Sequence, residues 1–285
     1  MGQLRDRMET DLRLAGYSPS TRKIYLGYAR LFTKYHMRSP AEMGEDQIRQ
    51  YLLHMVEEKK ISRETYRQVR AALIFLYTIT LKRQTEVEHL PVRRKKVKLP
   101  VVLSGTEVQA LIEAVRSPKY RAIVMAQYAG GLRISEACRL RPEDIDSKRM
   151  VIHVRAGKGG RDRYTVLSER FLASLRDYFR KHRPDGWLFP GKTADGHASP
   201  ETSRRVFHAA VAAAGISKTI TPHVLRHCFA THLLESGVDV TVIQALLGHG
   251  SLRATEVYTH VSVEHIGRVK SPLDLLGTPA AKPLG

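Results

Sequence analysis

TPHVLRH, residues 221–227, is the stretch that most constrains the fold of this chain. Thr221 is a suitable helix N-cap and Pro222 suits the first helical position, so the stretch predicts that a helix begins here. His223 and Arg226 are three residues apart and therefore share one face of that helix. A helix N-terminus, an imidazole and a guanidinium then meet at one point, and this combination predicts an anion-binding site.

The sequence around this helix predicts a mixed α/β domain over residues 104–276. The segments 149–155 and 161–167 are β-rich and flank the glycine-rich turn GKGG at 157–160, which is the signature of a β-hairpin. The tail at 277–285 is predicted to be disordered. Helical patterns predict the remaining elements at about 104–115, 120–130, 168–182, 200–214, 222–235 and 240–247.

The first 83 residues show helical patterns only. We expect one helix to end before Gly16 and three more to follow at 19–36, 45–58 and 62–80. The predicted fold is therefore mainly α with a small β-sheet (α+β). It combines an N-terminal helical bundle at 1–83 with a C-terminal mixed α/β domain.

Composition narrows the class of partner. The chain has 285 residues, a hydrophobic content of 42% and a formal net charge of +19. So large a positive charge predicts a polyanionic partner, most commonly nucleic acid, and the alternative is a basic protein that is merely soluble. No apolar run is long enough to span a membrane and the N-terminus has no apolar signal region, so we expect a cytoplasmic, nucleoid-associated protein. Cys138 and Cys228 lie in apolar helical patterns and are predicted to be reduced packing residues.

Residues 84–103 are predicted to form a basic linker. Within it, VRRKKVKLP at 92–100 places five basic residues in six positions, and such a run repels itself rather than packing. It is either a plain tether or a tether that also lies on nucleic-acid phosphates, and we favour the second. A stripe of arginines within 62–80 is either an ordinary solvated helix face or a surface that binds phosphates, and we again favour the second. The candidate phosphate contacts are Arg63, Arg67, Arg70, Arg93, Arg94, Lys95 and Lys96.

Four residues outside the TPHVLRH stretch suit the same anion. Arg133 follows a double glycine at a predicted helix start, and Lys158 occupies the tip of the predicted hairpin. His249 follows a predicted helix end, and Tyr258 lies nine residues further on. Each of them alone has an ordinary explanation as a surface, turn or packing residue. Glu136, one helical turn after Arg133, either orients a neighbouring cation or favours its own helix N-terminus.

Together these side chains suit attack on a phosphodiester by a phenolic oxygen. Planar guanidinium groups can bind the two non-bridging oxygens bidentately, and they stay charged at any working pH. A lysine can deliver a proton to a departing alkoxide. A phosphate ester of tyrosine keeps much of the original bond energy, so the break is reversible.

Two other patterns are set aside. GWLFPGKT at 186–193 matches a phosphate-binding loop, but ADGHASP follows it where a helix is required. We therefore expect no nucleotide there, and we read 187–189 as a short buried strand. His223, His227 and His232 have spacings that allow zinc, but no glutamate lies between the first pair and Arg226 would project beside the cation. No metal or cofactor is expected.

The order and local context of these stretches resemble the tyrosine recombinase (phage integrase) family. The resemblance is specific over about 104–262, whereas the first 82 residues look like the family's SAM-like core-binding domain only in a general way. It implies a catalytic domain of the DNA breaking-rejoining type and the catalytic set Arg133, Lys158, His223, Arg226, His249 and Tyr258. Cys228 and Gly250 stand where the family more often has serine.

The resemblance also implies a reaction and an assembly. Tyr258 would form a 3′-phosphotyrosyl link with double-stranded DNA, without metal or ATP, during integration, excision or dimer resolution. A homo-tetramer would act on two DNA sites, and the segment 262–276 would dock on a neighbouring subunit or on its own. The lack of a helix-sized insertion between Lys158 and His223 favours the Xer-like or mobile-element branch. A type IB topoisomerase and a non-catalytic DNA-binding regulator are the alternatives.

Overall fold

The computed structural model describes residues 2–93, 101–155, 162–193, 196–248, 266 and 269–276. The chain forms two compact units, Met1–Lys98 and Leu99–Gly285. The division lies inside the segment predicted to be the linker. Six predicted site residues lie outside the described residues: Arg94, Lys95, Lys96, Lys158, His249 and Tyr258.

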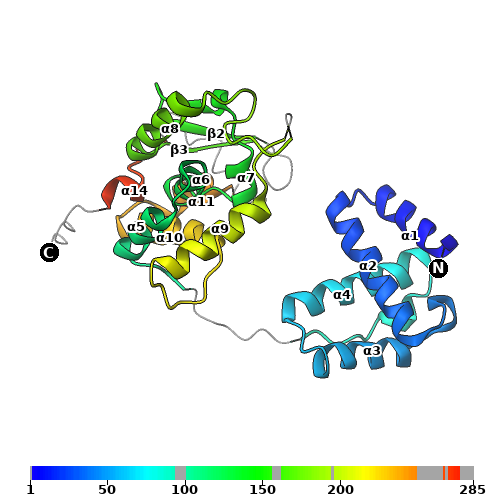
Figure 1. Cartoon of the computed structure of the whole chain (residues 1–285). Coiled ribbons are helices and arrows are strands. Elements are labelled where there is room, and N and C mark those ends of the chain that lie inside the picture. Colours follow the sequence, from blue (N-terminus) through cyan, green and yellow to red (C-terminus); the bar gives the residue numbers. More distant parts are fainter. Residues whose placement is uncertain are drawn as a thin grey trace. The chain divides into compact units, whose positions relative to one another are not determined.

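The N-terminal unit is a bundle of helices around its own core (Figure 1). Ser18 caps the second helix by accepting a hydrogen bond from the backbone N–H of Thr21, as its position before Pro19 suggests. Phe32, Tyr51 and Tyr77 are buried at its centre. The elements are α1 (Gly2–Leu14), α2 (Pro19–His36), η1 (Pro40–Glu42), α3 (Glu45–Glu57), α4 (Arg63–Phe75), the π-helical turn η2 (Leu76–Thr80) and η3 (Gln84–Val87).

Residues 84–93 belong to this unit and not to a free linker, which differs from the expectation. Val87 and Leu90 are apolar and almost completely buried, so releasing them would expose hydrophobic surface. Arg70 donates two hydrogen bonds to the carbonyl of Leu90, at 2.9 and 3.2 Å. Arg63 donates one to the carbonyl of Arg93 at 2.9 Å. These arginines therefore hold the segment on α4, which gives them a structural role besides the predicted contact with DNA.

The second unit surrounds one central helix, α6 (Pro118–Ala129). Every residue from Ala122 to Ala129 is buried, as expected of a helix covered on all sides. The other helical elements are α5 (Gly105–Ala114), α7 (Ile134–Cys138), η4 (Pro142–Asp144), α8 (Glu169–His182), α9 (Pro200–Ala213), α10 (His223–Glu235), α11 (Val240–Leu247) and α14 (Pro272–Leu275). Cys138 and Cys228 are buried free thiols.

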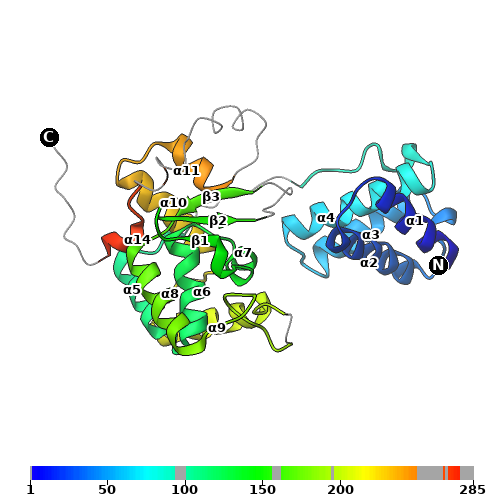
Figure 2. The same ribbon diagram turned by 90° about the horizontal axis from the view of Figure 1, so that it is seen from above.

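A small antiparallel sheet lies on this helical body (Figure 2). Its order is β1 (Ile145–Asp146), β2 (Val151–Val154) and β3 (Arg163–Val166). β2 and β3 pair from Val151↔Val166 to Val154↔Arg163, so the two strands of the predicted hairpin are present. The glycine-rich stretch at 157–160 lies outside the described residues. α11 packs beside β3. The prediction of a mainly α fold with a small β-sheet is confirmed.

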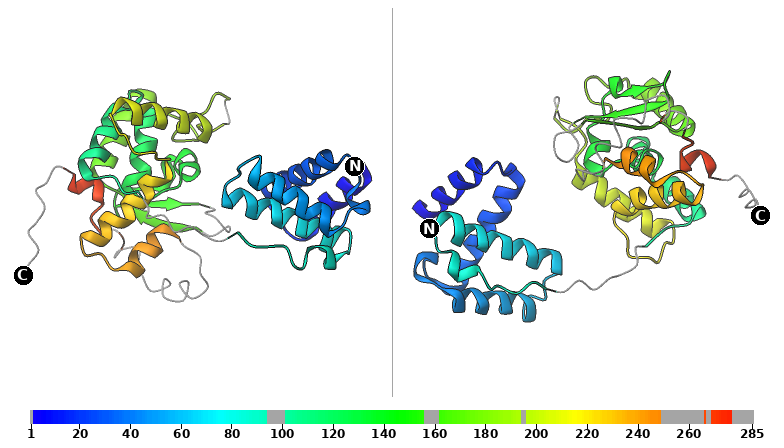
Figure 3. Two further views of the ribbon diagram at one scale, coloured as in Figure 1. Left: turned by 90° about the horizontal axis from the view of Figure 1, so that it is seen from below. Right: turned by 180° about the vertical axis from the view of Figure 1, so that it is seen from behind.

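The C-terminal segment 269–276 docks on the body of the unit, beside α6 and α8 (Figure 3). Ser271 donates a hydrogen bond of 2.7 Å to the carbonyl of Ala129. The carboxylate of Asp274 accepts hydrogen bonds from the Ser168 hydroxyl and from the backbone N–H groups of Glu169 and Arg170. Asp274 therefore serves as the anion at the N-terminus of α8, where the helix dipole favours negative charge.

Within the described ranges, no helix combines the length and the apolar character needed to cross a membrane.

Candidate active site

The turn after α6 brings the first predicted site residue into position. Gly131 has φ +64°, and a Cβ at this position would lie 2.6 Å from a ring carbon of Phe229. Only glycine fits so close to the ring in this backbone conformation. The turn leads directly into α7, with Arg133 at its N-cap position, and leaves the carbonyl of Gly131 facing α10.

Arg226 on α10 ties three chain segments together. Its guanidinium donates 2.6 Å to the carbonyl of Gly131 and also donates to the carbonyl of Leu247 at the end of α11. The residue is only 3% exposed. Burial, then the positive charges of Arg133 and Arg163, lower the pKa of Arg226 to about 9. That value is still well above neutrality, so the buried guanidinium remains charged.

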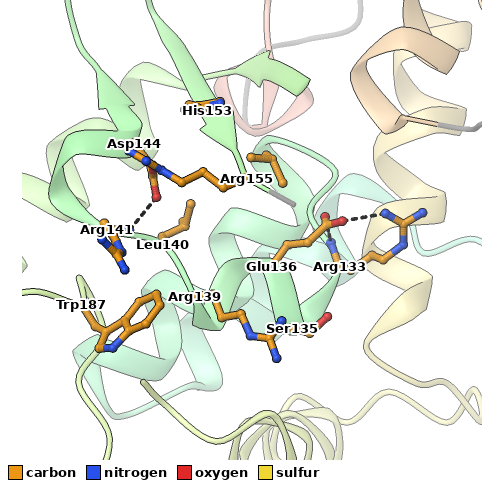
Figure 4. A pocket seen from close by; sticks show the side chains of 11 residues that line it. Arg133, Ser135, Glu136, Arg139, Leu140, Arg141, Asp144, His153, Arg155 and Trp187 are labelled. Atoms are coloured by element: carbon orange, nitrogen blue, oxygen red, sulfur yellow. Dashed lines mark hydrogen bonds and ion pairs between the residues drawn. The ribbon is translucent and has the colours of Figure 1, made fainter. Parts of the chain in front are cut away.

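Glu136 is the counter-ion at the centre of the site (Figure 4). One of its oxygens lies 2.6 Å from Nη1 of Arg133 and the other accepts 2.8 Å from the backbone N–H of Arg133. Arg163 binds both oxygens, at 2.7 and 3.1 Å, and Arg226 lies 3.9 Å away. Burial alone raises the pKa of Glu136, but the hydrogen bonds and charge of Arg163, followed by the bonds of Arg133, lower it to about 2.

The cluster therefore holds three guanidinium groups against one carboxylate. Its formal charge is +2, in a partly buried place where electrostatic interactions are stronger than in water. The Arg133 side chain keeps 26% of its surface exposed, whereas those of Arg163 and Arg226 keep 9% and 4%. Arg133 is thus the cation of the cluster that is most open to an incoming anion.

His223 is the first residue of α10 and lies beside this cluster. Its side chain is open to solvent on one side. Burial of the remainder, then the positive charges of Arg226 and Arg133, lower the pKa of His223 below its ordinary value. At neutral pH the imidazole is therefore mostly uncharged and able to accept a proton.

The structure thus brings together Arg133, His223 and Arg226, the three predicted catalytic residues that it describes. The loop at 186–193 forms no strand; Leu188 and Phe189 are buried, and Pro190 makes an isolated bridge with His197. The expected strand at 187–189 is therefore wrong. His232 is directed at Tyr128, whose hydroxyl lies 2.8 Å from Nδ1.

Arg163 was assigned no role from the sequence. Besides its two bonds to Glu136, it donates 3.0 Å from Nε to the carbonyl of Leu246. It also lies against Gly248, where a Cβ would come within 2.6 Å of its Cδ. Arg163 therefore links the hairpin to the end of α11, directly before His249. The available signal was weak: Arg163 is two residues before Thr165 and so shares its face of the strand, which is the buried face.

We expect Arg163→Lys to slow DNA strand cleavage by about tenfold or more, because a lysine cannot bind both carboxylate oxygens and a carbonyl at once. Unfolding stability should fall by roughly 1–3 kcal/mol, since buried acceptors lose their partners. Single-turnover cleavage and urea titration measure the two effects. Arg149→Lys, at an exposed arginine paired with Asp146, is the matched control. Equal rates for the two variants would show that Arg163 does not position the site.

Comparisons with known proteins show the family of the chain. The sequence profile of the phage integrase family matches residues 101–265, and that of the phage integrase N-terminal SAM-like domain matches 4–86. An integrase/recombinase of Sinorhizobium fredii is 44% identical over 287 residues, which cover 99% of this chain and 92% of that protein. Tyrosine recombinase XerA of Thermococcus onnurineus is 32% identical over 280 residues, which cover 95% of each chain.

Solved structures show the same fold. A crystal structure of XerA recombinase has a TM-score of 0.50 at 29% identity, covering 92% of this chain and 94% of that chain. A lambda integrase dimer bound to a COC′ core site has a TM-score of 0.73 at 19% identity, covering 88% of this chain and 95% of that chain. At the latter identity the likeness concerns the fold alone.

Proposed function

The chain belongs to the phage integrase family, and we propose that Arg133 and Arg226 hold a DNA phosphodiester while Tyr258 attacks it. The protein is a site-specific DNA recombinase of the tyrosine type, and DNA is its partner. The observation that carries the residue assignment is the cluster around Glu136, whose three guanidinium groups exceed its single carboxylate. Such an excess attracts a phosphodiester and stabilises the charge that develops as a nucleophile adds.

In the proposed cleavage step, the phenolic oxygen of Tyr258 forms a bond to phosphorus and the bond to the 5′-oxygen breaks. Neutral His223 accepts the phenol proton, and Lys158 donates a proton to the departing 5′-oxygen. Arg133 and Arg226 balance the added charge on the non-bridging oxygens, and His249 donates a hydrogen bond to one of them. The product is a 3′-phosphotyrosyl link and a free 5′-hydroxyl.

The rejoining step is the reverse reaction with a different strand. A 5′-hydroxyl from the second DNA attacks the phosphotyrosine and releases the Tyr258 phenol. One phosphodiester is broken and one is made, so the step needs no ATP.

The assignment of Tyr258 is tested by mapping the covalent adduct. A nicked suicide substrate loses its 5′-hydroxyl fragment after cleavage and so traps the intermediate. Trypsin then releases residues 254–268, in which Tyr258 is the single tyrosine. Mass spectrometry should find the nucleotide on this peptide. An adduct on any other tyrosine-containing peptide would overturn the assignment.

We also propose contacts with DNA outside the site. The N-terminal unit binds the duplex through exposed Arg67 and its neighbours on α4. The basic run between the units binds further phosphates of the duplex through Arg93, Arg94, Lys95 and Lys96.

We propose that the active assembly is a tetramer on two DNA sites, in which the segment 269–276 of one protomer docks on the next. Support comes from the docking site of this segment, which we call the socket and which lies at the start of α8. Leu273 is 1% exposed, and Asp274 makes three hydrogen bonds at the start of α8. Any protomer offers the same socket. Tyr258 lies between α11 and this segment in the sequence, so docking on a neighbour would couple assembly to the placement of the nucleophile.

Asp274→Ala should reduce recombination between two sites more than it reduces cleavage of one suicide site. The variant loses the anion that α8 binds, which weakens docking by about 1 kcal/mol or more. Sedimentation of protein on paired-site DNA should show fewer tetramers. Asp177→Ala, at an exposed carboxylate on α8, serves as the control. Unchanged tetramers and unchanged recombination would refute the docking role.

A further inference from the structure

A cavity of about 550 Å³ lies beside the cluster around Glu136 and is not used by the reaction described above. Figure 4 shows it between α7, the end of β2 and the loop that carries Trp187. Arg133 and Glu136 form one wall, so the cavity is continuous with the candidate active site. Arg139, Arg141 and Trp187 also line it.

The arginines of this cavity differ in how far they are neutralised. Arg155 is bound by Asp144 at 2.5 Å and lies 3.6 Å from Glu143. Arg141 lies 3.5 Å from Glu143, but both side chains are about half exposed, so this pair is weak. Arg139 makes no ion pair with any described residue.

Arg139 has a hydrogen bond to an imidazole instead of a carboxylate. Its Nε donates to the His197 ring at 3.3 Å. Within the cavity, Arg139 and Arg141 are therefore the cations whose charge is least compensated.

Trp187 gives the cavity an apolar wall next to these cations. The guanidinium of Arg141 lies 4.7 Å from the centre of its ring, in a cation–π contact. This contact holds the planar guanidinium of Arg141 over the ring and leaves the N–H groups at the edge of the guanidinium able to donate hydrogen bonds. A cationic edge beside an aromatic face suits one nucleotide of a DNA strand, with its phosphate on the arginines and its sugar against the ring.

We propose that this cavity binds a second backbone phosphate of the DNA strand, through Arg139 and Arg141, with the adjoining deoxyribose against Trp187. The inference rests on the proposed function, because Arg133 connects the cavity to the scissile phosphate. Arg133 and Arg139 flank the five-residue helix α7. Six residues of helix rise about 9 Å, which is little more than the distance between neighbouring phosphates of one strand. The second phosphate would therefore lie one or two nucleotides from the cleaved one.

Salt-dependent binding of a 30-base-pair duplex tests the proposal, in a Tyr258→Phe background so that no strand is cut. We expect Arg139→Ala/Arg141→Ala to lower affinity and to reduce the slope of log K against log salt by about 1. Arg139→Lys/Arg141→Lys should keep most of the slope, because it keeps the charge, and it also controls for folding. Arg180→Ala and Arg204→Ala, at exposed arginines on α8 and α9, should change neither quantity.

The fluorescence of the single tryptophan supplies a second readout. Saturation with the duplex should change Trp187 emission, and the change should be lost in Arg139→Ala/Arg141→Ala at equal saturation. An unchanged slope in that variant, or unchanged Trp187 emission in the parent protein, would overturn the proposal. Neither result depends on covalent chemistry. Failure of the Tyr258 assignment would appear instead in adduct mapping, so the two failures can be told apart.

Discussion

Tyr258→Phe is expected to abolish covalent trapping of DNA and to leave duplex affinity unchanged. The substitution removes one oxygen, which is the proposed nucleophile, while the phenyl ring and the cationic cluster remain. Two other phenols of the catalytic unit are poorly suited to replace it, because burial raises the pKa of Tyr128 and of Tyr178 and so disfavours the phenolate form of each. Adduct yield on a suicide substrate should fall on the order of 10³-fold or more.

Tyr164→Phe is the matched control for this experiment. Tyr164 lies on β3 next to Arg163 and stacks on His153 with ring centres 4.9 Å apart. It is half-buried and belongs to the same unit, so it is the described tyrosine that could most readily substitute. Adducts should persist in Tyr164→Phe. Persistent trapping in Tyr258→Phe, or loss of trapping in both variants, would refute the assignment.

The fold could be predicted because local signals and packing agree along most of the chain. Ser18 before Pro19 and Ser104 with Glu107 mark helix starts that the structure has at the same places. The two-residue strand β1 could not be predicted, because it has no periodicity of its own and forms only by pairing with β2. The linker was predicted to begin too early, since two isolated apolar residues, Val87 and Leu90, decide where packing ends.

The site could be predicted only in part, because some of its residues are defined by contacts with distant parts of the chain. Arg133, His223 and Arg226 stand in local contexts that suggest an anion site. Arg163 has no such context, because its role depends on the carboxylate of Glu136, 27 residues away, and on a carbonyl 83 residues away. Contacts across such separations follow from tertiary packing and not from spacing along the chain.

Glu136→Gln is expected to destabilise the catalytic unit by on the order of 3 kcal/mol at pH 7, because it leaves partly buried guanidinium groups without their counter-ion. The pKa of Glu136 is about 2, below its ordinary value of 4.5. A lowered folded-state pKa stabilises the fold above the ordinary value, and this stabilisation is lost as the pH falls towards 2. The difference in the free energy of unfolding between the parent protein and Glu136→Gln should therefore become smaller as the pH falls from about 4.5 to about 2.

Trp187 lies in the catalytic unit and is the only tryptophan, so its emission during urea unfolding follows that unit alone. Glu113→Gln, at an exposed glutamate on α5, should have little effect at any pH. A bound DNA phosphate would supply the anion that Glu136→Gln removes, so saturating duplex should stabilise this variant more than the parent protein. If the variant were as stable as the parent at pH 7, or if DNA stabilised both equally, Glu136 would not be the counter-ion that keeps the three arginines together for a phosphate.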